Sequence, residues 1–162
     1  MSKIHMPEVA ELGEQLRVLL GRTTKATEAG SPHIFEDSCH TARYLTRDDQ
    51  LVVLCQVDLT VAAAMGASLA MIPASAAEEA IKDGDLGENL TDAYCEVANI
   101  MASLLCKDGY PHVRWVSIEK SIDALSESDK AILASPSERI DIEVEFEGYG
   151  GGKMSIITID TK

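Results

Sequence analysis

The sequence predicts an α+β fold, in which long helices pack on a largely antiparallel sheet that includes a C-terminal β-hairpin. The hairpin is the clearest local pattern. Apolar residues at every second position from Ile140 to Phe146 alternate with carboxylates, and a glycine-rich turn at 148–152 leads into a second apolar segment. This period of two predicts strands at 139–147 and 153–160, the first with one buried face and one fully charged face. A second observation is a helical period of three to four residues from about 86 to 106.

The other elements follow from local signals along the chain. Apolar residues at helical spacing predict a first helix, and a continuously apolar segment predicts a strand covered on both faces. An alanine-rich run predicts a helix that Thr60 caps and Pro73 ends. The expected elements are a helix at 9–20, a loop or irregular strand at 22–38, strands at 43–46 and 51–59, helices at 60–71 and 73–80, a strand at 113–118, and a loop or short helix at 121–133.

Composition and charge exclude several classes of function. The chain has 162 residues, of which 46% are apolar, and it shows no linker, so a single domain over 1–162 is expected. Acidic residues number 27 against 14 basic ones, a net charge of −13. Nucleic acid and an anionic membrane surface are therefore not expected as partners, whereas a protein with a basic patch is. No membrane span or signal peptide is visible, which predicts a cytoplasmic protein.

Four cysteines occur without a CxxC pair, at positions 39, 55, 95 and 106. Because these positions fall in expected strands and helices, we interpret them as reduced, buried thiols. An alternative is a metal-dependent or thiol enzyme that uses Cys39 and His40, although the local ligand spacing of zinc sites is missing. The sequence contains no glycine-rich phosphate-binding loop and no serine-hydrolase elbow.

The long helix is expected to carry two rows of side chains, side by side. An apolar row faces the core, and a polar row lies about 100° away from it. The apolar row is Ala93, Val97, Ile100 and Leu104, and the polar row is Asp92, Glu96, Asn99, Ser103 and Lys107. A polar row is often no more than a solvated helix face. Asn99 is unusual there, because asparagine is a mediocre helix former and its amide competes for backbone hydrogen bonds.

The segment LTDAYCEVANIMASLL, with Asp92-x3-Glu96-x2-Asn99, resembles the signature helix of the CheC/CheX/FliY phosphatases. The order of expected elements is also similar to that of CheX over nearly the whole chain. CheC-type members carry the motif twice, but this chain has asparagine only at positions 89 and 99. A second motif in the N-terminal half is therefore impossible, and the resemblance is to CheX. The chain departs from the family pattern in two places. The segment Met101–Ser103 stands where the family helix has a glycine soon after the asparagine, and Pro111 follows Asn99 at a shorter distance than the family's proline does.

The resemblance implies a function and a mechanism. The substrate would be a phosphorylated aspartate on a CheY-like response regulator, whose own Mg²⁺ serves the reaction, so this chain would need no cofactor or metal. Asn99 would orient the attacking water, and Glu96 would pair with the active-site lysine of the regulator. Asp92 and Ser103 would contact the partner without taking part in the chemistry. An alternative is a catalytically silent CheC-like module that binds a signalling or flagellar partner.

Two further expectations concern charge and assembly. From Glu78 to Glu96 seven acidic residues are opposed only by Lys82, a local charge of −6 that favours a basic partner but also fits a solvated acidic loop. A homodimer is expected from the resemblance to CheX. The C-terminal hairpin is expected at or near a sheet edge, and Lys153 to Ile159 has few charges to discourage strand pairing. The carboxylates at 141–147 would repel one another, so the contact is expected elsewhere in the sheet.

Overall fold

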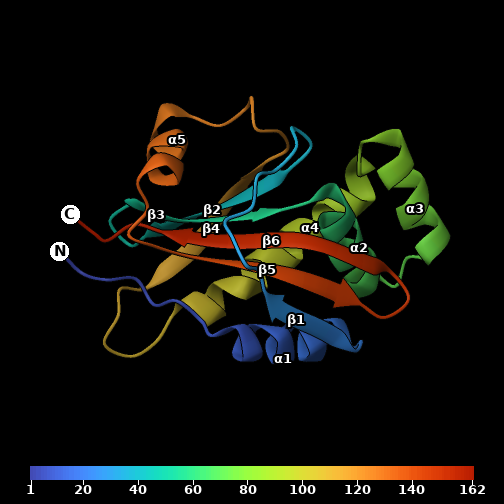
Figure 1. Ribbon diagram of the computed structural model, residues 1–162, viewed down its shortest axis with the longest axis horizontal. Coiled ribbons are helices and arrows are strands. Elements are labelled where there is room, and N and C mark those ends of the chain that lie inside the picture. The colour runs from blue at the N-terminus through green and yellow to red at the C-terminus, as the bar shows by residue number, and fades with distance from the viewer.

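A single antiparallel sheet of six strands organises the computed structural model, which describes residues 1–162. The strands lie in the order β1-β5-β6-β3-β2-β4, and every neighbouring pair is antiparallel (Figure 1). Their bounds are β1 Thr24–Glu28, β2 His40–Thr46, β3 Leu51–Val57, β4 Val113–Glu119, β5 Glu138–Phe146 and β6 Gly150–Thr158. This arrangement confirms the predicted fold class.

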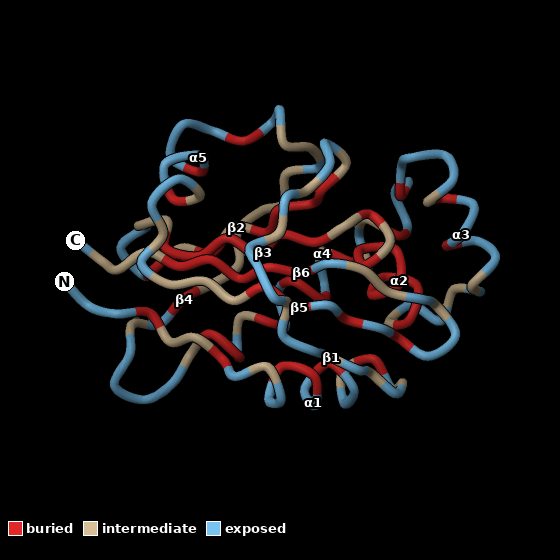
Figure 2. Tube along the Cα trace, in the orientation of Figure 1, coloured by how far each residue is buried: buried red, intermediate tan, exposed pale blue.

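The helices cover the two faces of the sheet unequally. They are α1 Val9–Leu20, α2 Leu59–Ala70, α3 Ala74–Asp83, α4 Gly87–Met101, the 3-10 turn η1 Ala102–Leu105, and α5 Glu127–Ala134. Side chains of α1, α2 and α4 share the main core of 33 buried residues with one face of the sheet (Figure 2). On the opposite face α5 covers only a small cluster of Leu54, Ile132 and Ile157. None of the helices is long and apolar enough to cross a membrane.

The C-terminal hairpin is confirmed, and it lies near one edge of the sheet, because only β1 lies outside β5. β6 lies between β5 and β3, so the hairpin is inside the sheet and the edges are β1 and β4. The carboxylate face of β5 is covered at one position, because Asp141 is only 9% exposed. Its carboxylate accepts hydrogen bonds from the Arg139 guanidinium at 2.7 and 2.9 Å, from the Ser155 hydroxyl at 2.6 Å and from the His33 backbone N–H at 3.0 Å.

The start of α2 differs from the prediction. The helix begins at Leu59 with Asp58 in the N-cap position, so the expected cap Thr60 already lies inside the helix. The Asp58 side chain accepts no hydrogen bond from the first turn of α2, although its backbone carbonyl accepts the Ala62 N–H at 3.0 Å. Its carboxylate instead accepts the Lys153 backbone N–H at 2.8 Å, because the chain turns from β3 into α2 directly beside β6.

A close crossing with α2 fixes the position of α4. A Cβ atom on Gly66 would lie 2.8 Å from the Leu90 carbonyl oxygen and 3.3 Å from the Tyr94 backbone nitrogen. The two backbones therefore approach as closely as a residue without a side chain permits. From the sheet, the buried hydroxyl of Tyr44 donates to the Ala98 carbonyl at 2.7 Å. The sheet and α2 together hold the middle and the end of α4.

Candidate functional site

The candidate site is the outer face of α4. Asp92, Glu96, Asn99 and Ser103 are all exposed, as their helical spacing predicts. The expected core row is partly wrong, because Ile100 is 39% exposed and Ala93 is half-buried. The buried stripe is Leu90, Tyr94, Val97, Ala98 and Met101. Contacts with Gly66 and Tyr44 turn these residues inward, so positions 93 and 100 fall at the border of the stripe.

Glu96 and Asn99 are free to contact a partner. Among the hydrogen bonds and ion pairs of the chain, none involves either side chain, whereas the Ser103 hydroxyl donates to the Ile100 carbonyl at 2.9 Å. The two residues lie three positions apart, which places them on neighbouring turns of one helix face. A carboxylate and an amide therefore project together into solvent.

The backbone beneath this face is rigidly supported. Burial raises the pKa of the Tyr44 hydroxyl well above its ordinary value, so the hydroxyl stays protonated and donates to Ala98, the residue before Asn99. At the same point the helix tightens, since backbone N–H groups at its end donate to the Asn99 and Ile100 carbonyls and the 3-10 turn follows. Asn99 thus lies on the last, doubly anchored turn of α4.

The surroundings of α4 are strongly acidic. All seven carboxylates between Glu78 and Glu96 are exposed, and none takes part in an ion pair. They lie on α3, on the α3–α4 connection and on the outer face of α4, with Glu96 the nearest to Asn99 in sequence. The resulting field favours encounter with a positively charged surface.

An apolar groove that no sequence pattern predicted lies between α1 and the end of α4. Its volume is about 190 Å³, and it begins one residue beyond Asn99. The lining residues are Gln15, Leu16, Val18, Leu19, Ile100, Met101, Ser103 and Leu104. Val18 is 62% exposed at the α1 side of the groove.

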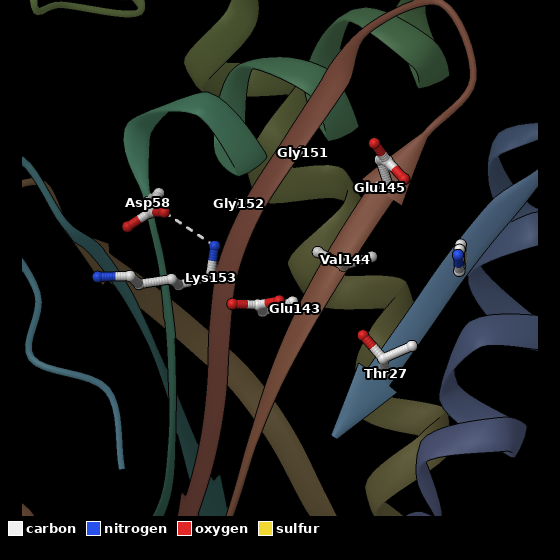
Figure 3. A pocket seen from close by; sticks show the side chains of 9 residues that line it. Thr27, Asp58, Glu143, Val144, Glu145, Gly151, Gly152 and Lys153 are labelled. Carbon is white, nitrogen blue, oxygen red and sulfur yellow. Dashed lines mark hydrogen bonds between the residues drawn. The ribbon is translucent and has the colours of Figure 1, made fainter. Parts of the chain in front are cut away.

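A larger hollow lies elsewhere, on β1, β5 and β6 (Figure 3). Glu143 and Glu145 alternate with core residues of β5, so this hollow of about 510 Å³ opens on the sheet face turned away from the main core. In register, Glu143 lies opposite Lys153, and Glu145 lies opposite Lys25. The lining also includes Asp58, so three carboxylates face two ammonium groups and the excess is a single negative charge, too small to select a ligand by charge alone.

The alternative site at Cys39 and His40 has no support. Burial raises the pKa of the Cys39 thiol to about 12, which disfavours the thiolate that a nucleophile or a metal ligand needs. Its sulfur contacts the His40 carbonyl, and the His40 ring is 3.0 Å from the Ser38 carbonyl through Nδ1. No group of three or more His, Cys, Asp and Glu side chains in the structure is arranged to hold a metal ion.

The fold has known counterparts among solved structures. No family model and no curated protein matches the sequence. A chain in the crystal structure of the FliG–FliM complex from H. pylori is 12% identical, with a TM-score of 0.56 over 93% of this chain and 86% of that one. The FliM–SpeE complex (TM-score 0.52, 11% identity, 93% and 81% covered) and the FliM middle domain (0.51, 11%, 93% and 84%), both from H. pylori, are also similar. The chain therefore has the CheC-like fold that the FliM middle domain shares.

Proposed function

We propose that this protein is a CheX-like phosphatase that hydrolyses the phospho-aspartate of a CheY-type response regulator. One observation carries the proposal. Glu96 and Asn99 stand exposed, without partners of their own, on a turn of α4 that buried contacts hold in place. A structural asparagine would instead bond within its own domain. The resemblance of Asp92-x3-Glu96-x2-Asn99 to the CheC/CheX/FliY motif then gives the two side chains their roles.

The proposed chemistry needs only positioning from this chain. The Asn99 amide accepts one hydrogen bond and donates another, so it can hold a water molecule in line with the phosphorus atom. The water oxygen attacks phosphorus, the bond to the aspartyl oxygen breaks, and inorganic phosphate and a free aspartate result. Glu96 pairs with the active-site lysine of the regulator, and Asp92 and Ser103 flank the contact. The Mg²⁺ that neutralises the phosphoryl oxygens belongs to the regulator.

Phosphate release tests the proposal. Phosphorylated CheY-type regulators from the same organism are mixed with wild type, Asn99→Ala and Asn89→Ala. Asn89 is the matched control, because it is the other asparagine of the chain, is also exposed and also lies on α4. Wild type and Asn89→Ala should accelerate dephosphorylation alike, and Asn99→Ala should lose about 100-fold or more of that acceleration. Equal rates for all three proteins would refute the role of Asn99.

A second candidate is a non-catalytic module that binds a signalling or flagellar protein through the same helix. The observation in its favour is the likeness to FliM chains, two of which were solved in complexes with FliG and with SpeE. Proteins of this fold thus bind other proteins. Tight binding of a regulator or flagellar protein by wild type, with no faster phosphate release from any regulator, would select this candidate.

A further inference from the structure

We propose that the groove between α1 and α4 is a docking site for the response regulator. The groove binds an apolar side chain that has a lysine or arginine beside it on the regulator surface. This inference rests on the proposed function and adds to it the surface that selects the partner. It assigns affinity to the groove and chemistry to Asn99.

The groove lies directly beside Asn99. Asn99 and Ile100 are consecutive, and Ile100 together with Ser103 lines the groove. A stable protein contact covers about 800 Å² on each partner, which corresponds to a disc with a radius of roughly 16 Å. A regulator that brings its phosphoryl group to Asn99 therefore covers the groove as well.

The lining of the groove is mostly apolar. Six of its eight lining residues are apolar, and Val18 and Ile100 are exposed on the two helices that form it, at 62% and 39%. Interfaces bury an apolar centre within a polar rim. The α1–α4 groove supplies the apolar centre, and Asp92, Glu96 and Asn99 supply the polar rim on one side.

Charge decides which kind of partner fits. On α1 the Arg17 guanidinium is neutralised by Glu14, with N and O 2.6 Å apart. In the polar row, the carboxylates of Asp92 and Glu96 on α4 form no ion pair and outnumber the single unpaired ammonium of Lys107, so the net unpaired charge of that row is negative. An apolar side chain flanked by basic residues is the complementary surface, and a like-charged acidic surface is repelled.

Affinity measurements separate the groove from the chemistry. The probes are beryllofluoride-activated receiver domains of CheY-type regulators, titrated by calorimetry with wild type, Val18→Asp, Ile100→Asp and Ile34→Asp. Ile34→Asp is the matched control, because Ile34 is 87% exposed, lies outside α1 and α4 and acquires the same charge. Val18→Asp and Ile100→Asp should each weaken binding at least 10-fold and raise the KM for dephosphorylation, with kcat less affected. Ile34→Asp should bind as wild type does.

Failure of this inference differs from failure of the proposed function. Fast dephosphorylation that needs Asn99, with unchanged affinity for both groove variants, overturns the groove and leaves the phosphatase. Weakened binding in the groove variants without any dephosphorylation by wild type supports the groove and rejects the phosphatase. A shift in oligomeric state when Val18 or Ile100 is replaced would assign the groove to a second copy of this chain, which overturns the inference. Absence of binding to every regulator tested also overturns it.

Discussion

At the scale of single residues, Glu96 and Asn99 lie on the same face of α4 but are expected to act at different steps. Water orientation by Asn99 matters only in the transition state, so Asn99→Ala should lower the rate and leave the Kd for the regulator within about two-fold. Glu96 is proposed to form a docking ion pair with the regulator, so Glu96→Ala should weaken the Kd about 10-fold and reduce the rate as well. Calorimetry and phosphate release on the same samples make this comparison. Equal, modest losses of rate with unchanged affinity would contradict the division of roles.

Asp141 shows how one buried carboxylate makes stability depend on pH. Burial alone would raise its pKa, but hydrogen bonds from Arg139, His33 and Ser155 outweigh burial and lower the pKa from 3.8 to about 2. The folded pKa lies below the unfolded value, so the stabilisation is complete above about pH 4 and is lost as the pH falls through about 2. The shift corresponds to about 2 kcal/mol.

Asp141→Asn should therefore lower the free energy of unfolding by about 2 kcal/mol near neutral pH. The difference from wild type should shrink as the pH is lowered from 4 towards 2. Urea denaturation at several pH values measures it. Glu143→Gln is the control, because Glu143 is exposed on the same strand and has no ion pair, and it should change little at any pH. If the difference in unfolding free energy between wild type and Asp141→Asn grew as the pH fell, the pKa of Asp141 would not be lowered by folding.

At the scale of elements, the crossing of α2 and α4 depends on one small residue. Alanine is about 1 kcal/mol better than glycine inside a helix. At Gly66, however, the added Cβ would meet the Leu90 carbonyl at 2.8 Å, and backbone cannot move aside without separating the helices. Gly66→Ala should therefore destabilise the protein by about 1–3 kcal/mol. Gly30→Ala, where no atom lies within 4 Å, should be neutral. Chemical denaturation of both variants tests this, and a more stable Gly66→Ala would show that the helices are not in close contact.

Local sequence patterns predicted most of these elements, because each helix or strand is determined mainly by the spacing of apolar residues and glycines within its own segment. The first helix was expected at 9–20 and occupies Val9–Leu20, since its apolar spacing ends where Gly21 adopts a φ of 65°. The hairpin was equally clear from period two and its glycines. Ile100 was placed in the core because helical spacing defines a stripe but not its direction. The contacts that turn α4, from Gly66 and Tyr44, join segments far apart in the sequence.

The candidate site was predicted in part for the same reason. Asp92, Glu96, Asn99 and Ser103 belong to one helix, so their common exposure follows from their spacing alone. The α1–α4 groove joins Val18 to Ile100, which are more than 80 positions apart, and no local pattern could reveal it. The burial of Asp141 was missed because it depends on His33, a residue of a loop without periodicity.

At the scale of the whole molecule, strand order decides where two copies could join. β6 cannot form the contact, because it is paired on both sides. The two free edges differ. β1 has five residues that are mostly exposed and include charged Lys25 and Glu28. β4 has seven residues, and those from Arg114 to Glu119 are all half-buried, so its apolar side chains remain accessible along an unpaired edge.

We therefore expect a homodimer in which two β4 strands pair antiparallel about a two-fold axis near Val116, the middle residue of the strand. Such a dimer extends the sheet across both subunits and leaves the outer face of α4 on each subunit free for its own regulator. Sedimentation equilibrium at micromolar concentration should give twice the mass of the 17.5 kDa chain. Val116→Lys should produce monomers, since it sets two ammonium groups against each other across the axis. Thr27→Lys, on the opposite edge strand, should leave the dimer intact. A monomeric wild type would refute the dimer, and a dimer that survives Val116→Lys but not Thr27→Lys would place it at β1.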